Sequence, residues 1–339
     1  MKKNLLYLAV LTLLISALIG CANQIGQGNS ADSQNIIITE SGEVMELEEE
    51  QILPTAKPTP EPEIVSDEVV FVEEPLEEPV IEQTATEIDE VDEENEHRLQ
   101  IVFLGDSILD GYRDVSGIAY LTGQACDAKV YNLAIGGTSA AAESGDDISS
   151  ENWDSLGLNG IVNAMSGGVD TDFLEGYRAG DILKQLDNVE NTDYFVVAYG
   201  LNDFFMGVPQ NNPERDYDIT TYAGALRVAI KNLRKLAPDA TVILCSPNYA
   251  QFFVKGVFIG DGNVVNTGNG TLFDYKGTCE YVAKEQDTLF LDAYLGLGID
   301  GYTADEYLED GVHLSHKGRA LYADALSKKI IKYEETKNN

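Results

Sequence analysis

The sequence is poor in positive charge. Its 339 residues include 22 Lys and Arg against 58 Asp and Glu, and the formal net charge at pH 7 is −36. A protein that binds nucleic acid needs clustered Lys and Arg to neutralise the phosphates. The composition therefore argues against nucleic acid as a partner, and it disfavours polyanionic substrates by charge repulsion.

Cysteine and histidine are also scarce, with four Cys and three His in the chain. The sequence has no CxxC or HExxH spacing, so it offers no metal site, and no cofactor is predicted. With Cys21 set aside for the reason given below, Cys126, Cys245 and Cys279 allow at most one disulfide, so disulfides do not form the scaffold of the fold. The pairing of Cys126 with Cys279 is left open. Cys245 ends an apolar run and is interpreted as a buried small hydrophobe.

The first twenty residues have the pattern of a processing signal. Lys2 and Lys3 precede an apolar run over residues 5–19, which is shorter than the ~20 residues that a spanning helix needs. The run ends in Leu-Ile-Gly followed by Cys21, which resembles the lipobox of bacterial lipoproteins. This resemblance implies a signal peptide over residues 1–20 and a lipid-anchored Cys21 on the extracellular face of the bacterial cytoplasmic membrane. The alternative is an ordinary secretory signal with an incidental cysteine.

Residues 21–98 lack the apolar content of a folded domain. The segment is rich in Glu and Pro, and Phe71 is its one aromatic residue. Such a composition buries too little apolar surface to offset the entropy of ordering the chain. We therefore predict a disordered, acidic tether, extended by charge repulsion and proline, that holds a domain away from the membrane.

Residues 99–337 alternate strand-like and helix-like segments and are predicted to form one α/β domain. Strands are expected at 99–104, 130–135, 194–199, 241–245 and 289–291, as short apolar runs of the kind found in parallel sheets covered on both faces. One helix is expected between the third and fourth strands. A second is expected to begin after Thr271, which can form a capping box with Asp274, and a third after an N-cap at Ser315. The Gly- and Ser-rich stretch 139–171 is predicted to be a long loop or an insertion.

Polar residues stand where the predicted strands end, at the edge where open α/β sheets bind ligands. Gly105-Asp106-Ser107 follows the first strand and Gly136-Gly137 follows the second. Asn202-Asp203 follows the third, and the sequence Asp310-Gly-Val-His313 precedes the last helix. Each motif alone is weak, but the four together, in this order, form a specific combination.

These motifs resemble those of the SGNH (GDSL) hydrolase family, and the resemblance covers essentially all of 99–337. It implies a three-layer α/β/α fold with a flavodoxin-like parallel sheet. It also implies that Ser107 is the nucleophile, that His313 is the general base and that Asp310 orients the imidazole, as in other serine triads. Asp106 and Asp203 are interpreted as structural acceptors of loop N–H groups, and His316 as a surface residue at a helix start.

The family further implies an oxyanion hole made of the Ser107 N–H, the Gly137 N–H and the Asn202 side chain. Gly136 is adjacent, so the glycine is uncertain by one position. The predicted enzyme is a serine esterase for carboxylic esters with short acyl chains, such as O-acetyl groups on extracellular glycans. Acyl transfer through the same site and a catalytically silent glycan-binding module are the alternatives, and the oligomeric state is left open.

Five aromatic residues follow the third and fourth predicted strands and could line an acyl pocket or a sugar platform. Ordinary packing in the core explains them equally well. They are Phe204, Phe205, Tyr249, Phe252 and Phe253.

Overall fold

The computed structural model describes residues 37–38, 44–45, 98–142, 153–186 and 188–337. The predicted signal peptide, Cys21 and most of the predicted tether lie outside these residues. Within the tether segment, β1 (Ile37–Ile38) pairs with β2 (Val44–Met45) as a short antiparallel ladder. Among the described residues, no helix is both long enough and apolar enough to cross a membrane.

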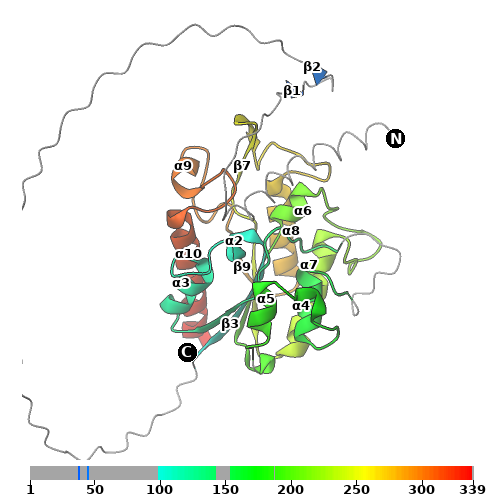
Figure 1. Cartoon of the computed structure of the whole chain (residues 1–339), viewed down its shortest axis with the longest axis vertical. Helices are drawn as coiled ribbons and strands as arrows, with labels where there is room; N and C mark the ends of the chain where they lie inside the picture. Colours follow the sequence, from blue (N-terminus) through cyan, green and yellow to red (C-terminus); the bar gives the residue numbers. More distant parts are fainter. Residues whose placement is uncertain (1–36, 39–43, 46–97, 143–152, 187, 338–339) are drawn as a thin grey trace, which may run out of the picture. The chain divides into compact units, whose positions relative to one another are not determined.

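A five-stranded parallel sheet forms the centre of the domain (Figure 1). Its strands are β3 (Gln100–Gly105), β4 (Lys129–Asn132), β5 (Tyr194–Ala198), β6 (Thr241–Cys245) and β9 (Leu289–Leu291). The order across the sheet is β4-β3-β5-β6-β9, and every pairing is parallel. This is the flavodoxin-like order, and the five predicted strands are confirmed.

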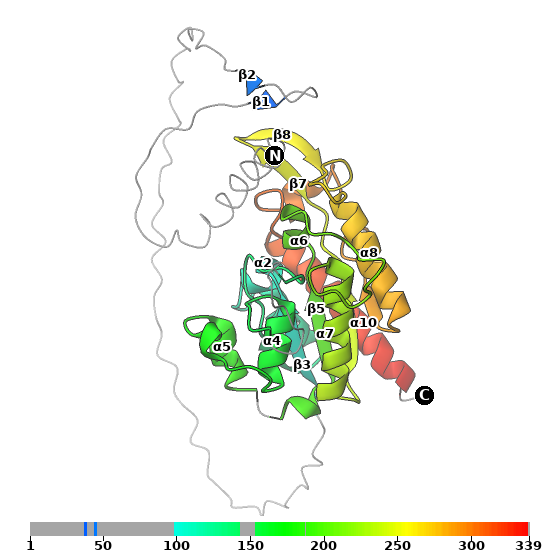
Figure 2. The same ribbon diagram turned by 90° about the vertical axis from the view of Figure 1, so that its right-hand side faces the viewer.

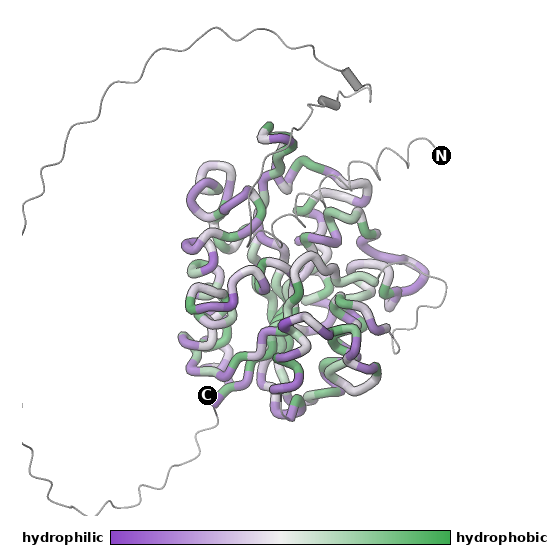
Figure 3. Tube along the Cα trace, viewed as in Figure 1, coloured by the Kyte–Doolittle hydropathy of each residue, from purple (hydrophilic) through white to green (hydrophobic). Residues whose placement is uncertain are grey.

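Helices cover both faces of the sheet, which gives the three predicted layers (Figures 1 and 2). On one face α3 (Ile118–Ala125) packs against α10 (His316–Lys337). On the other face α7 (Tyr222–Leu236) packs against both α4 (Leu158–Met165) and α8 (Leu272–Glu285). The strands between them are coloured as hydrophobic in Figure 3, as expected for a sheet that is buried on both sides.

The shorter helices lie in the connections. They are α2 (Ser107–Asp110), α5 (Arg178–Leu183), α6 (Leu201–Phe205), α9 (Ala304–Tyr307) and the 3₁₀ turns η1 (Asp172–Leu174) and η2 (Val189–Asn191).

The predicted helix starts are confirmed by their hydrogen bonds. Thr271 and Asp274 form a reciprocal capping box at the start of α8. The Ser315 hydroxyl accepts the N–H of Gly318 at 3.2 Å at the start of α10. These side chains satisfy N–H groups that have no partner within their helices, so both helices begin where the local sequence supplies a cap.

The prediction of one long loop over residues 139–171 is wrong, because α4 lies within it and all eight of its residues are buried. The helix contains Gly160, Asn159 and Asn163, which are weak helix formers, so local propensity gave no signal. Tertiary contacts compensate: α4 packs on α7, and the Asn159 side chain donates to the Ala225 carbonyl at 3.1 Å. Residues 143–152 of this stretch lie outside the described part of the chain.

A second feature that the sequence did not reveal is an antiparallel hairpin after β6. It consists of β7 (Gln251–Val254) and β8 (Val257–Asp261), which form a separate two-stranded sheet and pair with no other strand in the described part of the chain. The turn residues Lys255 and Gly256 both have positive φ angles, 52° and 78°, as a tight hairpin turn requires.

Candidate active site

Ser107 lies at the junction of β3 and α2. Asp106 caps α2 by accepting the Ile108 N–H at 3.0 Å, and Ser107 is the first residue of the helix. Gly105 is needed just before, because a Cβ there would lie 2.8 Å from the Ala198 carbonyl oxygen and 2.7 Å from Leu109 Cδ1. Strand β3 lies between β4 and β5 in the sheet, so the chain first moves from β3 to its neighbour β4 and then crosses to its other neighbour, β5. Ser107, at the end of β3, therefore stands at the topological switch point.

The structure brings Ser107, His313 and Asp310 together from opposite ends of the domain. The Nε2 atom of His313 lies 2.9 Å from the Ser107 Oγ, and its Nδ1 atom lies 2.7 Å from the Asp310 Oδ2. The second carboxylate oxygen of Asp310 accepts the backbone N–H groups of Val312 at 3.0 Å and His313 at 2.8 Å. Two oxygens of one carboxylate therefore hold both the ring and the backbone of His313 in place.

The ionisation of this pair follows from its contacts. Burial would raise the pKa of Asp310, but hydrogen bonds from the His313 ring and backbone and the charge of the ring lower this pKa to about 2. Burial would lower the pKa of His313, but the hydrogen bond and charge of Asp310 outweigh it and raise this pKa above its usual 6.5. An ionised Asp310 thus favours the imidazolium that forms when His313 takes a proton.

Two further loops reach the same edge of the sheet. Asn202, the second residue of α6, is buried and donates through Nδ2 to the Thr138 carbonyl at 2.9 Å. The loop after β4 carries Gly136 and Gly137. The Gly136 N–H already donates to Asp110 Oδ2 at 2.8 Å. Gly137 has φ +78° and open space where a Cβ would stand, so its backbone can be approached by a ligand.

A charged clamp joins this glycine loop to the helix that carries Ser107. The Arg113 Nε–H donates to Asp110 Oδ1 at 2.7 Å. The same guanidinium donates to the carbonyls of Asn132 at 2.7 Å and Ala134 at 2.5 Å. Sequence reasoning missed this pair, although opposite charges at i and i+3 directly after the Gly-Asp-Ser motif were a visible signal.

Asp106 and Asp203 have the structural role that was predicted for them. Asp203 accepts the N–H groups of Ala140 at 3.0 Å and Ala141 at 2.9 Å, and Asp106 accepts that of Ile108. Both carboxyls are fully buried, and burial raises their pKa values, to about 7 for Asp106 and about 6 for Asp203. His316 is exposed at the start of α10, as predicted.

Four of the five aromatic residues near the site belong to the core. Phe204, Phe205, Tyr249 and Phe252 are buried, whereas Phe253 on β7 is 42% exposed. Core packing thus explains the first four, and only Phe253 remains available to a ligand. Cys245 is buried as predicted, and Cys126, Cys245 and Cys279 are all free thiols.

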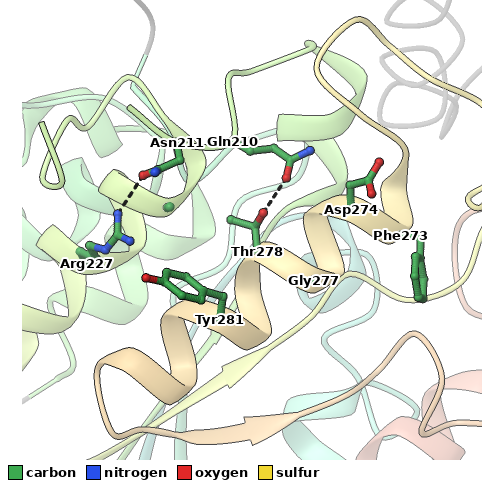
Figure 4. Close-up of a pocket in the computed structure, with 9 residues that line it drawn as sticks. Gln210, Asn211, Arg227, Phe273, Asp274, Gly277, Thr278 and Tyr281 are labelled. Atoms are coloured by element: carbon green, nitrogen blue, oxygen red, sulfur yellow. Dashed lines mark hydrogen bonds between the residues drawn. The ribbon is translucent and has the colours of Figure 1, made fainter. Parts of the chain in front are cut away.

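A hollow of about 300 Å³ between α7 and α8 lies apart from this site and does not include Ser107 or His313 (Figure 4). Its cation, Arg227, already pairs with Glu285 at 2.6 Å and donates to Asn211 at 3.0 Å. The charge that might attract a ligand there is therefore neutralised within the fold. Among the described residues, no cluster of His, Cys, Asp and Glu is arranged to hold a metal ion.

The fold is that of an open α/β protein, with His313 within hydrogen-bond distance of both Ser107 and Asp310 at the carboxyl edge of its parallel sheet. The sequence profile of the GDSL-like Lipase/Acylhydrolase family matches residues 103–321, more than half of the chain. The chain belongs to this family of acyl hydrolases, and the expected resemblance is confirmed.

Curated relatives and solved structures agree with this membership. The chain is 26% identical over 139 residues to the mouse isoamyl acetate-hydrolyzing esterase 1 homolog and 27% identical over 129 residues to its bovine counterpart. These matches cover 40% and 36% of this chain, and it spans about half the length of the two relatives, 55% and 49%. A possible lipase from Chitinophaga pinensis has the same fold, with a TM-score of 0.50 and 17% identity over 70% of this chain and 99% of that one.

Proposed function

We propose that the protein is a serine esterase that hydrolyses carboxylic esters through an acyl-enzyme. The observation that carries this proposal is the continuous hydrogen-bonded series from Ser107 Oγ to His313 and on to Asp310, at 2.9 and 2.7 Å. A serine hydroxyl is a weak nucleophile at neutral pH, and these distances are those that removal of its proton by a base requires.

In the first step, Ser107 Oγ attacks the carbonyl carbon of the ester while His313 Nε2 takes the hydroxyl proton. The C–O bond to the alcohol then breaks, and His313 returns the proton to the departing alcohol oxygen. In the second step, water loses a proton to His313 and attacks the acyl-enzyme. The bond from the acyl carbon to Ser107 Oγ then breaks, His313 returns the proton to Oγ, and the carboxylic acid leaves. Asp310 stays ionised throughout and balances the imidazolium charge.

The oxyanion formed in each step would be held by the N–H groups of Ser107 and Gly137 and by the Asn202 side chain. The Gly136 N–H is committed to Asp110 at 2.8 Å, which favours Gly137 as the glycine donor. Asn202 has two amide hydrogens, and its bond to the Thr138 carbonyl uses one of them. The other remains for the oxyanion.

We propose short acyl chains for the substrate. Two kinds of alcohol portion are compatible with this proposal: the sugar of an O-acetylated extracellular glycan, as the sequence favours, and an aliphatic alcohol, as in the name of the mouse and bovine relatives.

We also propose that Cys21 carries the lipid that anchors the protein at the extracellular face of the membrane. Mass spectrometry of the mature N-terminus tests this, since a lipid-bearing Cys21 gives an added mass that a secreted Cys21→Ala variant lacks.

The experiment that tests the esterase proposal is hydrolysis of p-nitrophenyl acetate, butyrate and octanoate by the full chain beside Ser107→Ala and His313→Ala. We expect turnover by the wild type with the highest rate on acetate, and losses of about 10³-fold or more in both variants. Absence of turnover in a folded wild type would overturn the proposal in favour of a silent binding module.

A further inference from the structure

The β7–β8 hairpin exposes an apolar surface beside the candidate active site. Phe253 is 42% exposed, Val257 65%, Phe258 53% and Ile259 47%. Phe253 and Phe258 are paired across the two strands, and their rings meet edge to face with centroids 5.6 Å apart. An exposed aromatic pair, with further exposed apolar side chains beside it along the strand, is a cost in water and marks a binding surface.

The hairpin is attached directly to the loop that carries Asp310 and His313. The Gln251 N–H donates to the Gly311 carbonyl at 2.7 Å. The Phe253 ring lies so close to Gly311 that a Cβ there would be 2.9 Å from its Cε2 atom. Gly311, with φ +87°, is therefore the residue that lets the aromatic ring rest on the backbone between Asp310 and His313.

The order of the strands places the hairpin on one side of Ser107. Along the edge of the sheet, the Gly137 loop follows β4, Ser107 follows β3 and Asn202 follows β5. The hairpin follows β6, and the loop with His313 comes after β9 at the other end. Figure 2 shows the hairpin rising beyond this edge of the sheet. The hairpin therefore belongs to the His313 side of the site.

The chemistry of ester cleavage decides which part of a substrate lies on that side. His313 Nε2 returns its proton to the leaving alcohol oxygen, so the alcohol portion must depart past the imidazole. The acyl oxygen is instead held by the proposed donors, the Gly137 N–H and the Asn202 side chain. A surface packed against the His313 loop therefore lies on the side of the alcohol portion.

We propose that the hairpin binds the alcohol portion of the ester and gives the enzyme a preference for apolar alcohols. This inference rests on the proposed esterase function and names its substrate class. The side chains offered by Phe253, Phe258, Val257 and Ile259 are hydrocarbon, and the two rings stand at 60° rather than forming one flat platform for a sugar. Aliphatic or aromatic alcohols bury apolar area there, whereas sugar hydroxyls would lose water without gaining hydrogen-bond partners from these four side chains.

The test compares two series of esters with the full chain. In the first, the acid is always acetate and the alcohol grows from methanol to butanol to hexanol; in the second, the alcohol is always methanol and the acid grows. Burial of a methylene is worth up to about fourfold in kcat/KM, so we expect hexyl acetate to exceed methyl acetate by at least about tenfold. Phe258→Ser should lower kcat/KM on hexyl acetate about 5- to 10-fold, leave methyl acetate within about twofold and leave the acyl-chain series unchanged.

A matched pair of surface variants controls for the general effect of removing an apolar side chain. Ile259→Ser alters the hairpin, whereas Ile331→Ser alters a residue on α10 with almost the same exposure, 41% against 47%. Only Ile259→Ser should reduce the preference for hexyl acetate. Phe253→Ala should also reduce the preference for hexyl acetate. Because Phe253 packs on Gly311, this variant could also disturb His313, and a loss of activity on methyl acetate would reveal that disturbance.

Three results would overturn the inference: a wild type that does not discriminate between the alcohols, hairpin variants that change the acyl-chain series instead, or higher kcat/KM on an acetylated cellobiose than on hexyl acetate. Binding to phosphatidylcholine vesicles that is lost in Phe258→Ser while the alcohol series is unchanged would likewise overturn it, in favour of a lipid-surface contact. In each case methyl acetate hydrolysis that depends on Ser107 keeps the esterase proposal intact. If the wild type hydrolysed none of these esters, both this inference and the esterase proposal would be overturned.

Discussion

The carboxylate of Asp110 joins the Ser107 helix to the glycine loop: its Oδ2 accepts the Gly136 N–H at 2.8 Å, while its Oδ1 accepts the Arg113 Nε–H at 2.7 Å. Because Gly136 is held in this way, the direction of the next peptide N–H, that of Gly137, is set by a side chain of the helix that begins at Ser107. The proposed nucleophile and one proposed oxyanion donor are thereby fixed relative to each other.

Asp110→Asn should lower kcat without raising KM. An amide side chain has one oxygen and cannot accept from both Gly136 and Arg113, so one of the two donors then faces an NH₂ group. We expect kcat to fall about 10- to 100-fold, less than the full loss of an oxyanion donor. Steady-state kinetics on p-nitrophenyl acetate measures this change.

The control for this variant is Asp181→Asn on α5, where the side chain is 77% exposed and 4.0 Å from Lys184. This variant should keep the wild-type kcat. A rise in KM with unchanged kcat in Asp110→Asn would contradict the positioning role, because it would mean that substrate binding rather than transition-state stabilisation was affected.

The pH dependence of kcat/KM should show an acid limb set by His313. The imidazole must be neutral to accept the Ser107 proton, and Asp310 raises its pKa above 6.5. As the pH falls through that pKa, the neutral fraction and the rate should fall by about tenfold per pH unit. Rates measured between pH 4.5 and 9 test this, and an acid limb centred well below pH 6.5 would contradict it.

Asp310→Asn should separate the orienting role of Asp310 from its effect on the His313 pKa. Removing the negative charge lowers the pKa of the imidazole, so the acid limb should move to lower pH. The plateau rate should drop by about 10³- to 10⁴-fold, since the ring loses the acceptor that fixes its tautomer. A pH–rate profile of the variant reports both quantities, and a plateau within tenfold of wild type would refute this assignment.

Asn202→Ala should reduce kcat by about 10²- to 10³-fold with little change in KM, as expected when one donor to a developing oxyanion is lost. Because Asn202 also holds the Thr138 carbonyl at 2.9 Å, thermal unfolding of the variant is needed beside the kinetics. A variant that unfolds at the wild-type temperature and retains its full rate would remove Asn202 from the oxyanion hole.

Asp106→Asn should make the stability of the domain less sensitive to pH. The pKa of buried Asp106 is raised from 3.8 to about 7, so its favourable contribution is present below pH 3.8 and is lost as the pH rises through 7. The variant lacks this loss and can still accept the Ile108 N–H. Its free energy of unfolding relative to wild type should therefore rise between pH 5 and 8, by up to a few kcal/mol at about 1.4 kcal/mol per pKa unit.

Urea unfolding at pH 5 and pH 8 measures this difference. A difference between wild type and variant that is the same at both pH values would mean that Asp106 does not titrate in this range.

Short-range patterns in the sequence determined the framework of this protein. The five apolar runs form the five parallel strands. A strand that is covered on both faces of its sheet buries every side chain, so its sequence is a continuous apolar run. Thr271 and Ser315 marked their helices because caps are local interactions. Ser107, Asn202, Asp310 and His313 were also predicted as site residues from the sequence, since each motif stands where a strand ends or a helix begins, and the fold brings Ser107 and Asp310 within hydrogen-bond distance of His313.

Contacts between distant segments decided the remainder. Helix α4 forms despite its glycine and asparagines because it is buried against α7, and the clamp of Asp110 on Gly136 spans two loops that only the sheet brings together. The sequence predicted Gly137 as the oxyanion donor, uncertain by one position, and the Gly136 N–H bond to Asp110 at 2.8 Å, which only the fold creates, supports that proposal. The position of Phe253 on Gly311 joins residues 58 positions apart in the printed sequence, and no local pattern records such a contact. Secondary structure follows from neighbours along the chain, whereas the surface offered to a substrate follows from neighbours in space.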